Sequence, residues 1–303
     1  MHEGSGAPGT DASLLSTVEV DSNHRVVNGV RLHTVTAGAE DGPLVVLLHG
    51  FPEFWYGWRH QIEPLVDAGY RVLVPDQRGY NLSEKPRTVR AYRRRDLARD
   101  VVDLVAAEDR ESAHVVGHDW GGGVCWDLAL RYPDVVDRVG VVNMPHPTAY
   151  RHQLRSNPEQ LLRSWYAVSF QIPRVPELVL QASDFALLER GLRETSAQGT
   201  FSDEALARYR RAWNREGALT GMLNWYRASA RYPPEYGRDR VTAPTIVVWG
   251  EDDEALVPAL ATASRRYCDD GRLELLPETS HWVPSERPDE LTDLLLDHLA
   301  DAD

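Results

Sequence analysis

Six short apolar segments restrict the fold of this chain more than any other feature of its sequence. Each is rich in Val, Leu and Ile, which suits strands that are buried on both faces of a parallel sheet. The segments span residues 43–50, 71–76, 113–119, 136–144, 245–253 and 272–278. Helical patterns alternate with them, for example over residues 91–109 and 289–302. The sequence therefore predicts an α/β layered domain with a mostly parallel sheet.

Two further patterns complete the predicted organisation. Residues 24–38 read as an antiparallel hairpin at the sheet edge, with Asn28-Gly29 at its turn. The alternation of strands and helices stops between about Met144 and Pro244, where only helical patterns occur. These patterns span residues 158–171, 175–192, 202–213 and 217–232. We predict a flexible tail over residues 1–20, a core formed by residues 21–143 and 241–303, and a helical lid over residues 144–240.

Composition excludes several classes of function. The formal net charge is −13, which argues against a nucleic-acid partner, because phosphates require a basic surface. No apolar run approaches the ~20 residues that a membrane span needs, and the N-terminus does not resemble a secretory signal, so no membrane partner is expected. Cys125 and Cys268 are far apart in the sequence, which argues against a disulfide framework or a zinc site and favours the reducing cytoplasm.

The stretch VVGHDWGGGVCW, residues 115–126, carries the strongest chemical signal. Its spacing matches G-x-Ser-x-G, the sharp strand-to-helix turn that presents a nucleophilic serine, but Asp119 takes the place of the serine. Gly117, Gly121 and Gly122 supply the small residues that such a turn needs. A plain alternative is a tight turn in which Asp119 caps the helix that follows.

Residues later in the chain favour the nucleophile. In this kind of fold the acid and then the histidine follow the nucleophile in chain order. Asp253 follows one predicted strand, beside Glu251 and Asp252, and His281 follows the next strand. Ligands gather after the strands of open α/β sheets, so His281 can act as a base that Asp253 orients. The backbone amides of Phe51 and Trp120 can form an oxyanion hole, and the sequence leaves open whether the bond before Pro52 is cis.

Taken together, these motifs resemble those of the soluble epoxide hydrolase family of α/β-hydrolases. The matching pieces are HGFPEFWYGWR (49–59), DQRGYNLSEKP (76–86), GHDWGG (117–122), EDDEALVP (251–258) and SHWVP (280–284). The resemblance covers roughly residues 24–300, with the motifs in the family's order. It implies an α/β-hydrolase core with an inserted helical cap, and an enzyme that acts on a small apolar epoxide and water without a cofactor or a metal ion.

The resemblance also assigns roles in a two-step mechanism. Two lid tyrosines are implied, Tyr166 in YAVSFQIP and Tyr226 in NWYR, although either could be an ordinary core aromatic by its spacing alone. Asp119 would open the epoxide while the two phenols bind the ring oxygen. His281, held by Asp253, would then activate the water that cleaves the resulting ester to a vicinal diol.

Several points stay open from the sequence. Trp55, Phe170 and Trp282 are expected to line the substrate pocket, with packing in the core as the alternative. A haloalkane or haloacid dehalogenase, which uses the same aspartate ester, is an alternative function. Against the haloalkane enzymes, Phe51 stands where they usually have Asn. Against the fluoroacetate type, which usually has arginines near the nucleophile, Trp120-Gly121 follows Asp119. A non-catalytic ligand-binding homologue is a further alternative. The chain could be a monomer or a homodimer.

Overall fold

Eight strands form one sheet in the order β1-β2-β4-β3-β5-β6-β7-β8. This computed structural model describes residues 18–300, so the predicted tail lies almost entirely outside the described residues. The strands are β1 (Val20–Val27), β2 (Val30–Ala37), β3 (Leu44–Leu48), β4 (Arg71–Pro75), β5 (Ala113–His118), β6 (Val136–Val142), β7 (Thr245–Gly250) and β8 (Gly271–Leu276). Strands β3 to β8 pair in parallel, and β2 pairs antiparallel with both β1 and β4. The predicted mostly parallel sheet is confirmed.

The hairpin at the sheet edge is also confirmed. Val27 pairs with Val30 across the turn formed by Asn28 and Gly29. Both turn residues have positive φ angles, 45° and 72°, as a two-residue hairpin turn requires. Asparagine and glycine adopt positive φ angles at low cost, which explains why this pair forms the turn between β1 and β2.

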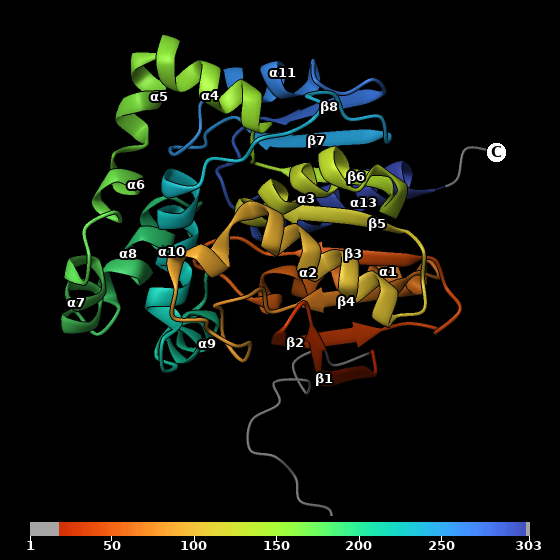
Figure 1. Cartoon of the computed structure of the whole chain (residues 1–303), viewed down its shortest axis with the longest axis horizontal. Coiled ribbons are helices and arrows are strands. Elements are labelled where there is room, and N and C mark those ends of the chain that lie inside the picture. The colour runs from red at the N-terminus through yellow and green to blue at the C-terminus, as the bar shows by residue number, and fades with distance from the viewer. Residues whose placement is uncertain (1–17, 301–303) are drawn as a thin grey trace, which may run out of the picture.

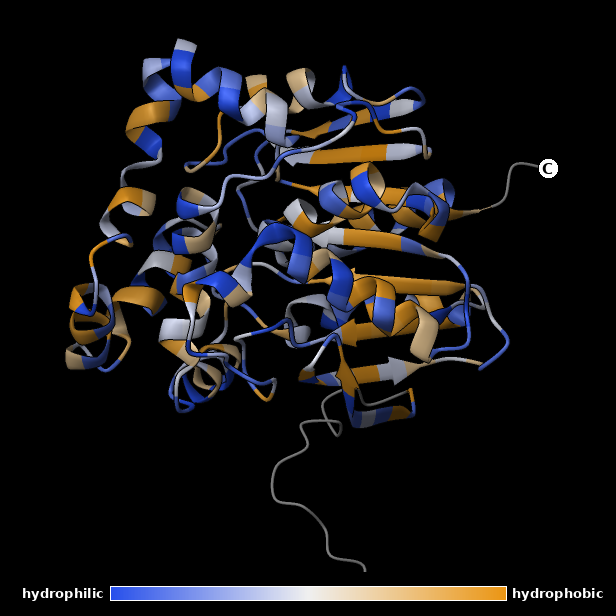
Figure 2. Ribbon diagram, viewed as in Figure 1, coloured by the Kyte–Doolittle hydropathy of each residue, from blue (hydrophilic) through white to orange (hydrophobic). Residues whose placement is uncertain are grey.

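Helices cover both faces of the sheet and leave its central strands fully buried. In Figure 1, α2 (Arg94–Ala107) and α3 (Trp120–Arg131) lie in front of the sheet, while α1 (Arg59–Asp67) and α13 (Pro288–Leu299) lie behind it. Every residue of β3, β5 and β7 is buried. Figure 2 accordingly shows hydrophobic residues along the central strands. This burial on both faces is the reason these segments read as continuous apolar runs.

Seven helices lie between β6 and β7, in the segment where the sequence predicts only helices. They are α4 (Pro147–Ser156), α5 (Pro158–Arg163), α6 (Trp165–Ser169), α7 (Val175–Ala182), α8 (Ala186–Glu194), α9 (Asp203–Trp213) and α10 (Ala218–Arg231). Two of the predicted helices are each divided in two. The helix predicted over residues 175–192 breaks because Asp184 and Phe185 take positive φ angles, 47° and 62°, which end α7 and redirect the chain into α8.

Short elements complete the fold. They are the 3₁₀ turns η2 (Trp55–Trp58), η3 (Val89–Tyr92) and η4 (Pro133–Val135), and the helices α11 (Ala259–Arg265) and α12 (Val283–Glu286). Between residues 18 and 300, no helix combines the length and apolar character that crossing a bilayer requires. Cys125 and Cys268 are both free and buried.

Candidate active site

Three polar side chains that are distant in the sequence meet at the carboxyl edge of the sheet. Asp119 directly follows β5, Asp253 lies in the loop after β7, and His281 lies in the loop after β8. Nδ1 of His281 is 2.7 Å from Oδ2 of Asp253, and Nε2 of His281 is 3.6 Å from Oδ2 of Asp119. The structure thus brings together the nucleophile, acid and histidine positions that the sequence predicts, in the order carboxylate, imidazole, carboxylate.

Asp119 occupies a sharp turn between β5 and α3. Its backbone has φ 49° and ψ −125°, and its side chain makes no capping hydrogen bond to α3, so the alternative of a simple helix cap does not hold. Close packing forms the turn: a Cβ atom on Gly121 would lie 2.8 Å from the carbonyl oxygen of His49, and one on Gly50 would lie 2.6 Å from Oδ1 of Asp119. Only glycine at these two positions lets the loop after β3 approach the carboxylate.

The two carboxylate oxygens of Asp119 have different surroundings. Oδ1 accepts a hydrogen bond of 2.8 Å from the backbone N–H of Phe51, whereas Oδ2 faces His281. Trp120 is the first residue of α3, where a backbone N–H has no acceptor within its own helix. The Phe51–Pro52 peptide bond is cis, a point that the sequence left open.

Asp253 is held by a full set of donors. Its Oδ1 accepts hydrogen bonds from the backbone N–H groups of Ala255 and Leu256, at 2.8 and 2.9 Å. Its Oδ2 accepts one from the side-chain amide of Asn143, at 2.6 Å, in addition to the one from His281. Because a carboxylate can only accept, Nδ1 of His281 carries a proton, and Nε2 is the atom directed at Asp119.

The charges of this group shift two pKa values in opposite directions. Burial opposes charge on both groups, but their mutual attraction outweighs it. Burial alone would raise the pKa of Asp119, yet the neighbouring His281 lowers it below its ordinary value. Burial likewise disfavours the charged form of His281, but Asp253 and Asp119 raise its pKa to about 10. Asp119 is therefore an ionised carboxylate at neutral pH.

Two tyrosine side chains come to this site from the helices between β6 and β7. Tyr166 lies on α6 and Tyr226 on α10, and their ring centroids are 6.0 Å apart. Burial, followed by the charge of Asp119, raises the pKa of Tyr226 well above its ordinary value. Burial, followed by Tyr150 and Asp119, does the same for the pKa of Tyr166. Both phenols stay protonated and can donate hydrogen bonds.

Aromatic rings surround the tyrosines and the histidine. Phe170 contacts the rings of Tyr166 and Tyr226, with centroids 5.9 and 5.0 Å apart. Trp282 contacts the ring of His281 at 5.1 Å. Trp55 differs from these two, because it is 1 % exposed and its ring contacts are with Phe54 and Tyr56. Its surroundings are those of a core residue.

A buried hydrogen-bond network lies behind the histidine, and the sequence prediction did not include it. Nδ1 of His118 lies 3.1 Å from Oε2 of Glu53, and its Nε2 donates to the backbone carbonyl of His281 at 2.9 Å. The other oxygen of Glu53 accepts from the hydroxyl of Tyr209 at 2.7 Å. Glu53 lies in the motif HGFPEFW and His118 in the motif GHDWGG. Polar, ionisable residues inside buried segments were therefore the sequence signal that could have revealed this network.

A second missed feature connects α5 to the loop that carries Asp253. Gln160 is fully buried, and its side-chain amide binds the backbone of this loop at Ala255 and Val257. Arg163 donates a further hydrogen bond to the backbone carbonyl of Asp253. No local pattern reveals these contacts, because they join residues about 90 positions or more apart in the chain.

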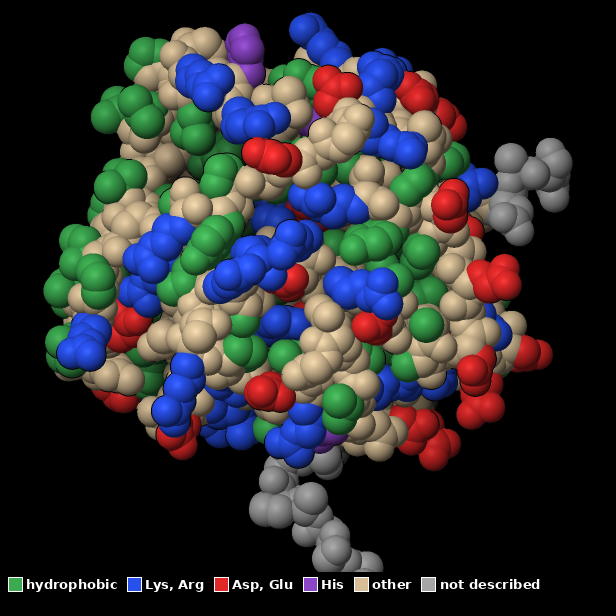
Figure 3. Space-filling view, viewed as in Figure 1, with side chains coloured by type: hydrophobic (Ala, Val, Ile, Leu, Met, Phe, Trp, Pro, Cys, Tyr) green, Lys and Arg blue, Asp and Glu red, His purple; other side chains and the backbone are tan. Residues whose placement is uncertain are grey.

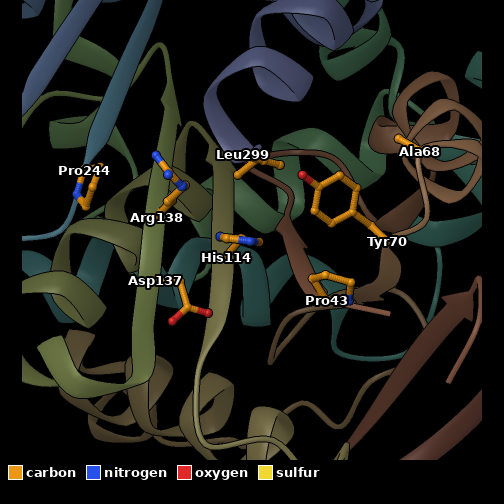
Figure 4. A pocket seen from close by; sticks show the side chains of 8 residues that line it. All are labelled: Pro43, Ala68, Tyr70, His114, Asp137, Arg138, Pro244 and Leu299. Atoms are coloured by element: carbon orange, nitrogen blue, oxygen red, sulfur yellow. The ribbon is translucent and has the colours of Figure 1, made fainter. Parts of the chain in front are cut away.

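A separate hollow of about 500 Å³ lies at the opposite edge of the sheet (Figure 4). Tyr70, His114 and Arg138 are among its lining residues. Its lining also includes Pro43 and Pro244, which directly precede β3 and β7. Because the amino ends of parallel strands meet at one edge and the carboxyl ends at the other, this hollow is not part of the Asp119 site.

Comparisons with known proteins agree with this geometry. The family model described as alpha/beta hydrolase fold matches residues 43–288. The AB hydrolase superfamily protein YfhM of Bacillus subtilis is 45 % identical over 90 % of this chain and 95 % of its own length. Epoxide hydrolase 3 of Xenopus tropicalis is 35 % identical over 90 % of this chain and 75 % of its own length. The crystal structure of Bacillus megaterium epoxide hydrolase with an inhibitor superposes with a TM-score of 0.82, at 29 % identity, covering 91 % of this chain and 99 % of that one.

Proposed function

The chain belongs to the alpha/beta hydrolase fold family, and from this membership and the geometry around Asp119 we propose that it hydrolyses epoxides to vicinal diols. The observation that carries the proposal is the pair of neutral phenols, Tyr166 and Tyr226, beside an ionised carboxylate in the nucleophile position. An epoxide needs both features at once. Its carbon is attacked by the nucleophile while its oxygen, which becomes an alkoxide, accepts hydrogen bonds.

In the first step, Oδ2 of Asp119 attacks an epoxide carbon. The bond between this carbon and the ring oxygen breaks. The oxygen takes the hydroxyl proton of Tyr166 or Tyr226 while the other tyrosine donates a hydrogen bond, and solvent returns a proton to the tyrosine that gave it up. The product is a hydroxyalkyl ester of Asp119. We assign the attack to Oδ2 because Oδ1 already accepts a hydrogen bond from Phe51.

In the second step, water attacks the carbonyl carbon of this ester. The ester has removed the negative charge of Asp119 that favoured the imidazolium, so His281 can release a proton to solvent and become neutral. Neutral His281 then takes a proton from the water through Nε2, while Asp253 stabilises the imidazolium that forms. The former Oδ1 gains negative charge, and the backbone N–H groups of Phe51 and Trp120 stabilise it. The ester bond then breaks, the leaving oxygen takes the proton held by His281 to complete the diol, and Asp119 is regenerated as a carboxylate.

The chemistry explains why aspartate is preferred over serine at this turn. A serine that opened an epoxide would form an ether, which has no carbonyl group for water to attack. Aspartate forms an ester, which can be cleaved. Side chains of the protein supply the nucleophile, the acids and the base, so neither step needs a cofactor or a metal ion.

We also propose that residues 144–240 act as a cap over the core formed by residues 21–143 and 241–303. The support is that α6 and α10 carry the two tyrosines while the core loops carry the other groups. Phe170 and Trp282 would line the substrate space, which suits a small apolar epoxide. The free thiols of Cys125 and Cys268 fit a reducing compartment, and we propose a cytoplasmic location on that basis.

The test is to incubate the protein with a panel of terminal, aromatic and fatty epoxides and to measure diol formation. Asp119→Asn should abolish turnover and any ester adduct seen by intact-protein mass spectrometry. Asp252→Asn, at an exposed acid in the loop that carries Asp253, is the matched control and should retain activity. Halide release from haloalkanes without diol formation would instead indicate a dehalogenase, and full activity of Asp119→Asn would refute the covalent mechanism.

A further inference from the structure

The helices between β6 and β7 expose an unusual amount of apolar surface. Within residues 18–300, twelve large apolar side chains are exposed, and nine of them lie between Leu161 and Leu187. Leu162, Trp165 and Val168 are 74 %, 69 % and 70 % exposed. In Figure 1, α5, α6 and α7 follow one edge of the molecule, and Figure 3 shows hydrophobic side chains gathered along this edge. We call this surface the α5–α8 face.

The α5–α8 face has apolar residues on both sides of its helices. On α7, Leu180 is buried against the rest of the chain, whereas Leu178 on the same helix is 62 % exposed. On α6, Tyr166 and Phe170 contact the aromatic rings of the site, whereas Trp165 and Val168 face water. A helix that is apolar all round is normally buried all round. A partner that covers the outer side would satisfy this pattern.

We propose that this partner is a second copy of the chain, and that the α5–α8 face forms the interface of a two-fold symmetric homodimer. The centre of the face has few charges: between Ser164 and Ser183 only Arg174 and Glu177 are charged. Glu177 is already paired within the chain, with Arg227 at 2.7 Å. An apolar centre depleted of charge, with a polar rim, is the usual anatomy of a protein–protein interface.

Both ends of the face carry charges of both signs. Residues 147–163, over α4 and α5, carry three arginines and one glutamate, whereas residues 184–194, over α8, carry three acids and two arginines. Within the chain, Asp184 and Glu189 already pair with Arg210, and Glu194 pairs with Arg190, so the two ends form a mixed polar rim around the apolar centre. A two-fold axis near α6 would place this rim around a shared apolar centre. An anionic membrane fits less well, because the rim carries both signs and the chain has a net charge of −13.

The size of the face also fits a dimer. Nine side chains that are about half to three-quarters exposed leave on the order of 600 Å² of apolar surface open to water, at the upper end for a monomer. A standard interface buries about 800 Å² on each partner, of which roughly 60 % is apolar. The apolar centre and its charged rim together would therefore bury about as much surface on each partner as a stable dimer needs.

The dimer would have a consequence for the proposed catalysis, and this part of the inference rests on the proposed function. Helix α6 has only five residues, and it presents Trp165 and Val168 outward and Tyr166 inward. Contact with the partner would immobilise this short helix and so position the phenol of Tyr166. Loss of the dimer should then slow formation of the ester more than its hydrolysis.

Sedimentation velocity over a wide range of protein concentration tests the proposal. The wild-type protein should sediment at twice the chain mass of 34.1 kDa. Leu162→Glu combined with Val168→Glu should sediment as a monomer, with an unchanged circular dichroism spectrum. Val26→Glu is the matched control, because Val26 is 77 % exposed but lies on β1, and this variant should remain a dimer.

The outcomes separate the dimer from the proposed activity. A wild-type protein that is monomeric at every concentration, or a double variant that stays dimeric, would overturn the inference. Binding of a monomeric wild-type protein to phosphatidylglycerol vesicles would overturn it as well, in favour of a lipid surface. Absence of epoxide turnover would refute the proposed function but would leave the sedimentation result intact. Single-turnover rates of the monomeric double variant test the coupling to Tyr166.

Discussion

The side-chain oxygen of Gln160 accepts a hydrogen bond of 2.9 Å from the backbone N–H of Val257. Its side-chain nitrogen donates to the carbonyl of Ala255 at 3.0 Å. One side chain of α5 thus holds the loop that carries Asp253, and Asp253 in turn binds His281. Stability and the second catalytic step should both depend on this contact.

We expect Gln160→Ala to destabilise the protein by about 1–3 kcal/mol, because it removes the partners of a buried backbone N–H at Val257 and a partly buried carbonyl at Ala255. Urea denaturation measures this loss. Hydrolysis of the ester should slow more than its formation, since the loop orients the base. Gln181→Ala, at an exposed position on α7, is the control and should change neither quantity. Equal stability of the two variants would contradict the assigned role of Gln160.

The pKa of His281 should fall when Asp119 loses its charge. The two carboxylates raise this pKa to about 10 in the resting protein, after burial has opposed it. Esterification of Asp119 removes one of these charges, so His281 becomes a neutral base more readily at the moment when a base is needed. NMR titration of the histidines should show a lower pKa for His281 in Asp119→Asn than in the wild type, and an unchanged value would refute this coupling.

The same shift links pH to stability. The folded-state pKa of His281 lies above its ordinary value of 6.5, so folding favours the protonated form. This contribution to stability is fully present below about pH 6.5 and is lost as the pH rises through about 10. His281→Gln should therefore destabilise the protein more at pH 6 than at pH 10, as measured by denaturation at both values. A pH-independent difference would show that the charge of His281 contributes nothing to folding.

We expect Tyr166→Phe and Tyr226→Phe each to slow formation of the ester by roughly 10²–10⁴-fold, the range for loss of a general acid. Hydrolysis of a preformed ester should persist. Rapid-quench kinetics resolves the two steps. Tyr232→Phe, at the exposed residue that directly follows α10, serves as the control. If both single variants kept wild-type rates, the tyrosines would have no role as acids.

We expect His281→Gln to form the ester and then to accumulate it, because only the second step needs the base. Mass spectrometry after exposure to an epoxide should find the adduct on the peptide that contains Asp119. His152→Gln, at an exposed position on α4, should turn over without accumulation. A variant of His281 that carries no adduct would place the histidine in the first step instead.

Gly50→Ala tests the close approach of the loop after β3 to the nucleophile. The added Cβ would lie 2.6 Å from Oδ1 of Asp119, in the place that the hydrogen bond from Phe51 requires. Activity should fall strongly, by about 10²-fold or more, as when one oxyanion donor is removed. Gly191→Ala, where the added Cβ meets no atom, should leave the rate unchanged. Equal rates for the two variants would contradict the proposed oxyanion hole.

Much of this arrangement was predictable from sequence because it depends on local patterns. Continuous runs of Val, Leu and Ile identify the buried parallel strands, and Asn28-Gly29 identifies the hairpin turn. The positions of Asp119, Asp253 and His281 after such strands predict that they meet, because the carboxyl ends of parallel strands share one edge. The pair of tyrosines depended instead on resemblance, since helical periodicity does not distinguish a phenol at a site from one in a core.

Other features arise only when distant segments pack together. The break between α7 and α8 depends on two positive φ angles that no residue preference at Asp184 or Phe185 demands. Three contacts described above join residues 65 or more positions apart in the chain. They are the hydrogen bonds of Gln160 to Val257, of His118 to Glu53, and of Phe51 to Asp119. Strand and helix patterns report the environment of one segment at a time. Hydrogen bonds between segments depend on distances and orientations that exist only after the chain has folded.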